Sequence, residues 1–220
     1  SISPHEKACY HHIEFPSYKG VEVEVHYRPS FLLCFWHNRK LQKYYERVKE
    51  KQFSHRVMLG EQGEVAIPTV EFNLIFQLTH IYAHLMNEGI GLRQLLDYYF
   101  VLQHADIKNL TELQRNLKHF GLWKFAGAIM YIMHEVFGMP ASRLIVPLNE
   151  KYGNFVLNEV LEAGNFGSYD KRNRFGKSQL GHNLQRVYRD IRLIKYFPAE
   201  ALSEPIFRVW HFFWRMKNKK

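Results

Sequence analysis

The stretch YHHIEFPSYKGVEVEVHY, residues 10–27, alternates apolar and polar residues on both sides of a turn at residues 16–20. Such alternation is typical of a β-hairpin, because successive side chains of a strand point to opposite faces. The apolar members of the second strand share one face, which we expect to be buried against helices: Val21, Val23 and Val25. The acids and histidines of both strands share the other face: His12, Glu14, Glu22, Glu24 and His26.

This polar face has the chemistry of a site for a hard divalent cation, since Mg²⁺ prefers carboxylate oxygens. The alternative is an ordinary hairpin with one solvated face, which is the commoner reason for such a pattern in antiparallel sheets.

Helical spacing replaces the alternation near His37, where a charged helix begins. The short apolar pieces around Gly60 and Gly63 in residues 56–67 predict a second small hairpin. The chain after Pro68 has a helical pattern throughout. We therefore predict a mostly helical α+β fold with a small antiparallel or mixed sheet at the N-terminus. Its expected parts are residues 1–67, with the hairpin and the charged helix, and residues 68–220, a helical bundle.

Three helix starts are predicted from capping signals. Thr69 is expected to cap one helix, and Thr111 with Gln114 forms a capping-box pair for another. Pro205 suits the first turn of the last helix, because the missing N–H of proline has no partner there in any case.

The composition excludes several classes of protein. Hydrophobic residues make up 46% of the 220 residues and aromatic residues 15%, too many for a disordered chain. The two cysteines have neither disulfide nor zinc spacing, which fits a reducing compartment. No secretory signal pattern and no apolar run long enough for a bilayer is present, so we expect a soluble cytoplasmic protein. The first residue is Ser, so a fragment of a longer protein is expected.

The net charge of +9 is concentrated near the C-terminus, where residues 171–220 hold 13 Lys and Arg against 3 Asp and Glu. Eight of these cations lie in a loop and the helix after it: Lys171, Arg172, Arg174, Lys177, Arg186, Arg189, Arg192 and Lys195. The helix also has an apolar stripe, formed by Leu180, Leu184, Val187, Ile191 and Ile194. We expect a solvated basic face, with weak binding of a polyanion as the alternative.

Several segments together resemble a known family: VEVEVHYRPSFL (residues 21–32), HNRKLQ (37–42), EFNLIFQLTHIYAHLMNEGIGLRQLLDYYFVL (71–102), GNFGSYDKR (164–172) and FFWR (212–215). The family is one of uncharacterised nucleotidyltransferases found in bacterial loci for surface polysaccharides. It is placed in the DNA polymerase beta-like superfamily. The resemblance covers nearly the whole chain and identifies the N-terminal strands as part of a nucleotidyltransferase palm.

The resemblance implies a metal-dependent transfer of a nucleotidyl group from a nucleoside triphosphate to an acceptor hydroxyl of unknown identity. Enzymes of that superfamily hold two divalent metal ions, normally Mg²⁺, with an Asp-x-Asp strand and a third carboxylate on a neighbouring strand. VEVEVHY matches the strand of the third carboxylate. Glu24 is the best match for this catalytic, metal-binding acid and Glu22 is the second.

The chain departs from the family pattern before Val21, because no Gly-Ser turn with an Asp-x-Asp strand occurs among residues 1–20. One carboxylate strand cannot assemble a two-metal site. We therefore expect this chain to be inactive alone. The alternative function is a non-catalytic helical module that binds a polyanion or a protein partner through its basic C-terminal part.

Two arginines are candidates for contacts with nucleotide phosphates. Arg28 follows the carboxylate strand, and its other role would be to screen Glu22 and Glu24. Arg93 and Asp97 are four residues apart on a helix, so an ion pair between them is the structural alternative for Arg93.

Two further clusters have both a structural and a functional interpretation. His80, His84 and Glu88 are spaced to line one helix face, where packing or hydrogen bonding is expected and a metal site is the alternative. The aromatic run at residues 210–214 is expected to close the core or a homo-oligomer contact, with a membrane-interface anchor as the alternative.

Overall fold

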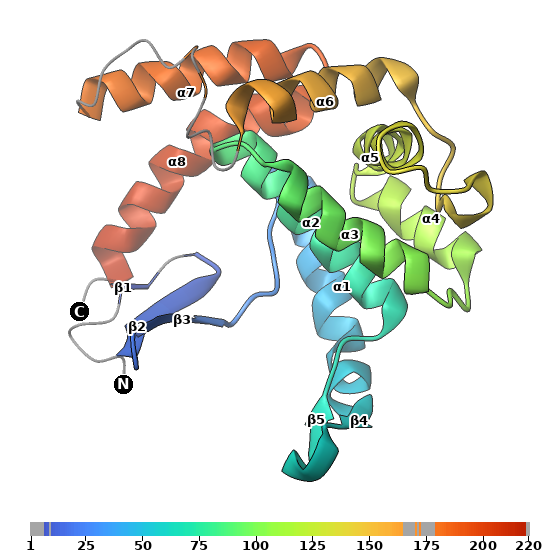
Figure 1. Cartoon of the computed structure of the whole chain (residues 1–220). Helices are drawn as coiled ribbons and strands as arrows, with labels where there is room; N and C mark the ends of the chain where they lie inside the picture. Colours follow the sequence, from blue (N-terminus) through green and yellow to red (C-terminus); the bar gives the residue numbers. More distant parts are fainter. Residues whose placement is uncertain (1–6, 9, 165–169, 171, 173–178, 219–220) are drawn as a thin grey trace.

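The computed structural model describes residues 7–8, 10–164, 170, 172 and 179–218. In this part of the chain, two small sheets lie near the N-terminus and eight helices make up most of the rest (Figure 1). The strands are β1 (Lys7–Ala8), β2 (His12–Tyr18), β3 (Val21–His26), β4 (Arg56–Met58) and β5 (Glu64–Ala66). The helices are α1 (Phe35–Ser54), α2 (Val70–Asn87), α3 (Leu92–His104), α4 (Leu110–His119), α5 (Trp123–Glu135), α6 (Glu150–Ala163), α7 (Gln179–Ile194) and α8 (Pro198–Asn218). The predicted mostly helical α+β fold is confirmed.

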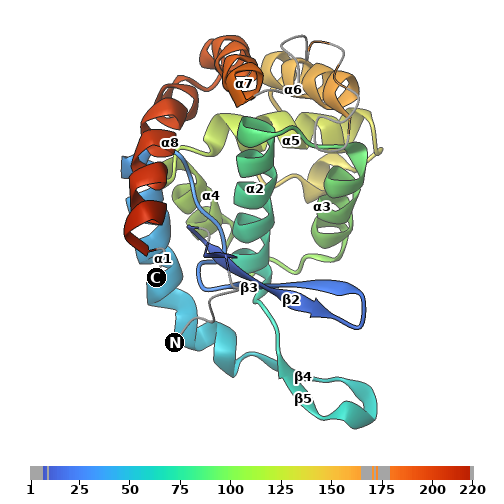
Figure 2. The same ribbon diagram turned by 90° about the vertical axis from the view of Figure 1, so that its left-hand side faces the viewer.

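The front hairpin forms at the predicted place and with the predicted faces, but β2 continues to Tyr18, so that residues 16–18, which the sequence predicts in the turn, belong to the strand. β1, β2 and β3 form one antiparallel sheet in that order. The register pairs His12 with His26 and Glu14 with Glu24, so these four positions share a face. Lys19 and Gly20 form the turn, with positive φ angles of 51° and 79°. Gly20 adopts such an angle without steric cost because it has no Cβ. The predicted second hairpin is β4–β5, which projects away from the helices in Figures 1 and 2.

The predicted burial of the valine face is wrong. Val21 is 64% exposed and Val25 is 49% exposed. The reason is the orientation of the hairpin, whose opposite face, with His12 and His26, lines a cavity together with α2 and α8. Strand alternation predicts which residues share a face, but it does not predict which face turns toward the helices.

Helix α2 supplies much of the core. Leu74, Ile75 and Leu78 are completely buried in one hydrophobic cluster that includes residues from α1 to α8. Beside them the buried Thr79 hydroxyl joins the hydroxyl groups of Ser30 and Tyr45 in a hydrogen-bonded triangle. The segment before α1 is thereby joined to α1 and α2. Since one cluster spans both predicted parts, their division at residue 67 remains a prediction.

The N-terminus of α1 is held by α8. The Glu200 side chain is only 3% exposed. Its Oε2 accepts hydrogen bonds from the backbone N–H groups of Leu33 at 2.6 Å and Cys34 at 2.9 Å. Its Oε1 lies 3.0 Å from His37 Nδ1. A carboxylate is favourable at a helix N-terminus because the N–H groups there have no partner within the helix.

A close approach fixes His37 from its other side. The backbone of Gly121, between α4 and α5, has a φ of +73°, and a Cβ at this position would lie 2.3 Å from Cε1 of His37. Only glycine satisfies both constraints.

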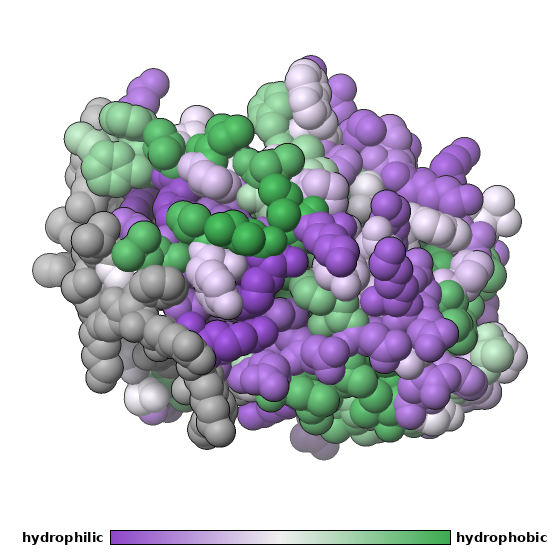
Figure 3. Space-filling model, turned by 90° about the horizontal axis from the view of Figure 1, so that it is seen from above, coloured by the Kyte–Doolittle hydropathy of each residue, from purple (hydrophilic) through white to green (hydrophobic). Residues whose placement is uncertain are grey.

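Helix α7 presents the face opposite to the one we predicted. The predicted apolar stripe is exposed where the structure describes it, with Ile191 at 64% and Val187 at 46%, and apolar side chains gather on this side in Figure 3. Arg189 and Arg192 are instead half-buried. The prediction of a solvated basic face is therefore wrong for these two residues.

Ion pairs with buried acids explain why the arginines of α7 face inward. Arg192 Nη2 lies 3.1 Å from Glu159 Oε2, and Arg172 makes two further hydrogen bonds to the same carboxylate at 2.8 and 3.1 Å. Arg172 also contacts Asp170 through Nε at 2.8 Å. Arg189 donates to the backbone carbonyl of Asn87. The rest of the predicted basic loop lies outside the described residues, apart from Asp170 and Arg172.

Two predicted helix starts differ from the structure. Asn109, not Thr111, is the N-cap of α4, and its side chain accepts a hydrogen bond from the Glu112 N–H at 2.9 Å. Helix α8 begins at Pro198, so Pro205 lies inside it. Pro198 takes the first-turn position favoured by proline, and the helix continues past Pro205 without the hydrogen bond that its missing N–H would make. Thr69 is the N-cap residue of α2, although its side chain makes no capping hydrogen bond.

Replacing Glu200 tests its role as the tie between α8 and α1. Glu200→Ala leaves two buried N–H groups without an acceptor, and we expect a loss of about 3 kcal/mol in unfolding free energy. Denaturant unfolding followed by circular dichroism measures it. Glu162→Ala, at an exposed position of α6, is the control. Equal stability of the two variants would contradict the role assigned to Glu200.

The inverted orientation of α7 gives a second prediction. We expect Arg192→Gln to lower the unfolding free energy by about 2 kcal/mol, less than a fully unpaired buried charge costs, because Arg172 still neutralises Glu159. Arg186→Gln changes an exposed cation of the same helix and should cost less than about 0.5 kcal/mol. Denaturant unfolding measures both values. If the two variants have the same unfolding free energy, Arg192 does not stabilise the fold through Glu159.

Candidate functional site

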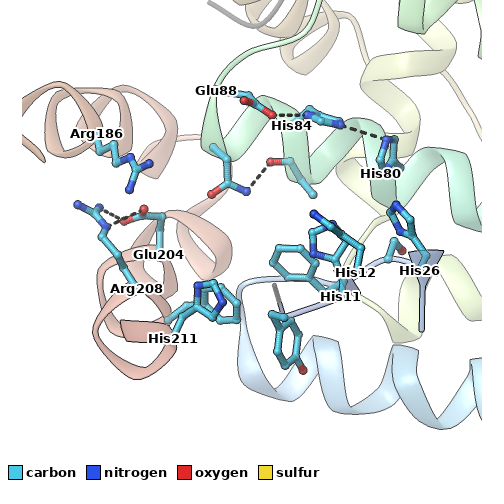
Figure 4. A pocket seen from close by; sticks show the side chains of 16 residues that line it. His11, His12, His26, His80, His84, Glu88, Arg186, Glu204, Arg208 and His211 are labelled. Carbon is cyan, nitrogen blue, oxygen red and sulfur yellow. Dashed lines mark hydrogen bonds and ion pairs between the residues drawn. The ribbon is translucent and has the colours of Figure 1, made fainter. Parts of the chain in front are cut away.

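A cavity of about 580 Å³ lies between the front hairpin, α2 and the C-terminal helices (Figure 4). Its lining is rich in histidine, arginine and aromatic rings: Tyr10, His11, His12, His26, Ser30, Phe31, His80, Ala83, His84, Asn87, Glu88, Arg186, Glu204, Phe207, Arg208 and His211. These residues are far apart in the sequence, so only the folded chain brings them together.

The hairpin wall consists of three imidazoles. Nδ1 of His12 lies 3.0 Å from Nε2 of His11, and the ring of His26 lies 5.2 Å from that of His11 and 5.3 Å from that of His12. His12 and His26 are cross-strand partners in the register. His11 joins them because it comes just before β2, where the alternation of a regular strand does not apply.

The α2 wall is a hydrogen-bonded row on one helix face. His84 Nδ1 lies 2.7 Å from Glu88 Oε1, and His84 Nε2 lies 3.0 Å from His80 Nε2. The hydrogen bond from His84 is the main reason that the pKa of Glu88 is lowered. The predicted hydrogen-bonding role of these three residues is thus confirmed. Figure 4 shows that this row and the hairpin histidines lie on two sides of one cavity.

Burial dominates the protonation of His11. Together with repulsion of positive charge by the neighbouring His12, His26, His80 and His84, burial lowers the pKa of His11 to about 3. The ring is therefore neutral at physiological pH, and its unprotonated nitrogen can accept a hydrogen bond or bind a cation.

The third wall combines charges from α7 and α8. Arg208 pairs with Glu204, with Nε 3.0 Å from Oε1. Next to this pair, burial and the Glu204 carboxylate raise the pKa of Asp190 to about 7. Arg186 of α7 adds an exposed guanidinium to the lining.

Aromatic rings form the base of the cavity. Phe31 and Phe207 stack with centroids 5.3 Å apart, and Tyr10 meets each of them edge-on at 5.4 Å. Arg28, which we predicted to contact nucleotide phosphates, lies over the Tyr10 ring, with its Cζ atom 4.3 Å from the ring centroid. The aromatic run of α8 takes part here through Trp210 and Trp214, both in edge contact with Tyr10, while Phe212 and Phe213 are more than half exposed.

The other predicted site residues have different positions. The backbone places Glu24 opposite Glu14 and Glu22 on the same face, in continuation of His26. Arg93 is exposed in the first turn of α3 and is not among the residues lining the cavity. The roles assigned to all four predicted site residues remain predictions.

Sequence reasoning missed His11, Arg208 and His211 as members of one site. The frequency of histidine, 13 in 220 residues, was the available signal. It does not say which of them meet, because no spacing rule relates a strand to helices that are 70 and 200 residues away.

A second group with metal-ligand chemistry, Cys34, His37 and Glu200, lies at the start of α1. Both oxygens of its carboxylate already accept hydrogen bonds at the helix N-terminus. This group is accounted for by the tie between α1 and α8.

Residues 3–138 match the model of a family described as uncharacterised nucleotidyltransferase. No curated protein and no solved structure matches the chain. None of the described helices combines the length and the apolar character that a bilayer span requires.

Asp190 and Glu204, the two acids beside the cavity, predict that the unfolding free energy depends on pH. Because the pKa of Asp190 is raised in the folded state, its protonated form is stabilised by folding, and this stability is lost as the pH rises through about 7. Between pH 6 and 8.5 we expect the unfolding free energy to fall by about 1–2 kcal/mol, with Arg208 and Arg189 offsetting part of the repulsion.

Denaturant titrations at the two pH values measure this dependence. Asp190→Asn should make the unfolding free energy nearly independent of pH in this range. Asp106→Asn changes an exposed surface acid and should leave the pH dependence as in the unchanged protein. An Asp190→Asn variant with the full pH dependence would contradict the assignment.

Proposed function

Because the chain belongs to the uncharacterised nucleotidyltransferase family, we propose that it takes part in metal-dependent transfer of a nucleotidyl group from a nucleoside triphosphate to an acceptor hydroxyl. One observation supports the placement of this chemistry. The hairpin face that carries Glu24 is the face whose histidines line the cavity with α2 and α8. A nucleotide in this cavity would therefore lie beside the proposed carboxylate strand.

The donor set of this face fits Mg²⁺. Glu14 and Glu24 are direct cross-strand partners in the register, and Cβ atoms of such partners are about 4.5–5.5 Å apart. Carboxylate oxygens are the ligands that Mg²⁺ prefers. Glu24 is the proposed third carboxylate of the metal site and Glu22 the second candidate. Bound Mg²⁺ would neutralise phosphate charge in the transferred group.

The other cavity residues suit a nucleotide. Arg186 supplies an exposed guanidinium group for phosphate oxygens, and Arg208 adds one that it shares with Glu204. Tyr10, Phe31 and Phe207 offer ring faces and edges for a base. Arg28, above the Tyr10 ring, remains a candidate for a phosphate contact. Arg93 would need a ligand that extends beyond the cavity to take the same role.

The proposal assigns the first two metal ligands to an Asp-x-Asp strand outside these 220 residues. Residues 1–20 contain no such motif, and the acids of the hairpin supply only the remaining part of the set. We infer that the 220 residues bind nucleotide but do not release pyrophosphate by themselves. A cytoplasmic location belongs to the same proposal, on the basis of the cysteine usage.

The alternative of a polyanion-binding module has less support in the structure. Arg172, Arg189 and Arg192, three of the cations that would carry it, contact Glu159, Asp170 and the Asn87 carbonyl within the chain. Cations with internal partners contribute less to counterion release, so this alternative remains a prediction of weak binding.

Nucleotide binding tests the proposal directly. Calorimetric titration with the four ribonucleoside triphosphates should show binding of at least one that is stronger with Mg²⁺ than without. Glu24→Gln should weaken the Mg²⁺-dependent binding about tenfold, equivalent to about 1.4 kcal/mol.

The matched control is Glu64→Gln, which removes an exposed acid from the other hairpin and should change nothing. An assay for pyrophosphate release should give no signal. If none of the triphosphates binds at millimolar concentration, the proposed site is wrong. If the 220 residues release pyrophosphate and Glu24→Gln abolishes it, the missing ligands are within the chain.

A further inference from the structure

The three histidines of the front hairpin have the geometry of a metal site. One ligand atom from each of His11, His12 and His26 lies within 4.8 Å of the other two. The closest pair, His12 Nδ1 and His11 Nε2, is 3.0 Å apart. Two nitrogens bound tetrahedrally to one Zn²⁺ at about 2.0–2.1 Å are about 3.3 Å from each other. Small rotations of the three rings would therefore place their nitrogens around one ion.

The backbone holds these residues in place. His12 and His26 are paired across the strands, and the carbonyl of His11 accepts hydrogen bonds from the N–H groups of Tyr27 at 3.1 Å and Arg28 at 3.2 Å. Three ligands from two strands are thus positioned before any ion binds. Such preorganisation lowers the entropy that binding would otherwise cost.

We propose that His11, His12 and His26 bind a divalent transition metal ion of the Zn²⁺ type at the hairpin end of the cavity. Three imidazole nitrogens are the ligand set of many zinc sites with an open fourth position, and imidazole is a poor ligand for Mg²⁺. All three histidines line the cavity, and the His80–His84–Glu88 row of α2 is part of the same lining.

This site goes beyond the proposed nucleotide site and does not depend on it. The carboxylate positions Glu14, Glu22 and Glu24 lie further along the same face and offer oxygen, while the histidine end offers nitrogen. The two ends of the face therefore select different metal ions. An ion at the histidine end would join the start of β2 to the end of β3, and it would also place a positive charge at the cavity wall.

Zinc binding by the purified chain tests the inference. The protein is dialysed against a chelator and titrated calorimetrically with Zn²⁺, with Co²⁺ absorbance as the report of nitrogen coordination. We expect one equivalent of Zn²⁺ that an excess of Mg²⁺ does not displace. His12→Gln and His26→Gln should each weaken Zn²⁺ binding by at least about 100-fold, because the loss of an outer-shell partner alone can already cost that much affinity.

Two controls separate this site from other zinc ligands. His104→Gln removes an exposed imidazole at the end of α3, and Cys34→Ser removes a ligand of the group at the start of α1. Both should bind Zn²⁺ as the unchanged protein does. Melting curves in chelator should be the same for all variants, so that lost binding is not lost folding. His26 is exposed, which makes His26→Gln the variant least expected to disturb the fold.

The outcomes that overturn the inference are distinct from those for nucleotide binding. Absence of a stoichiometric Zn²⁺ site would overturn it, and so would a site that survives His26→Gln or disappears in Cys34→Ser. Each of these results is independent of whether a nucleoside triphosphate binds.

Discussion

The carboxylate of Glu200 is the constraint on which the arrangement of the molecule depends. It lies near the start of α8 and accepts hydrogen bonds from two N–H groups at the start of α1, 166 and 167 residues earlier. The last helix is thereby fixed beside the first one. Figure 1 shows that α8 lies across from the hairpin, and its residues Glu204, Phe207, Arg208 and His211 line the cavity together with the hairpin and α2.

A second set of buried charges determines how α7 lies on the bundle. Glu159 of α6 is almost fully buried and needs cations, which Arg172 and Arg192 provide. An unpaired buried carboxylate is costly, whereas an exposed aliphatic side chain is tolerated, so the arginines take the inner face. The apolar stripe is left outside. The usual rule that the apolar face of an amphipathic helix is buried fails here because the neighbouring helix presents acids.

Two chemistries line the cavity, and a third continues along the hairpin face beyond its lining residues. Imidazole nitrogens occupy the end at His12 and His26, carboxylate positions continue at Glu14 and Glu24, and guanidinium groups come from α7 and α8. A nucleotide with its metal ions requires the carboxylates and the guanidinium groups, since phosphates need cations and Mg²⁺ needs carboxylates. The family assignment over residues 3–138 and the guanidinium groups in the cavity lining are the two grounds for the proposed nucleotide ligand.

The local structure could be predicted from the order of the residues: both hairpins, the shared face of His12, Glu14, Glu24 and His26, and most of the helices. These follow from alternation and from helical spacing, which are properties of neighbouring residues. Packing between distant segments determines three further features: the valine face lies outward, two arginines of α7 lie inward, and His11 and His211 share a cavity with α2. Those outcomes depend on contacts between segments far apart in the chain, and no periodicity within one segment contains that information.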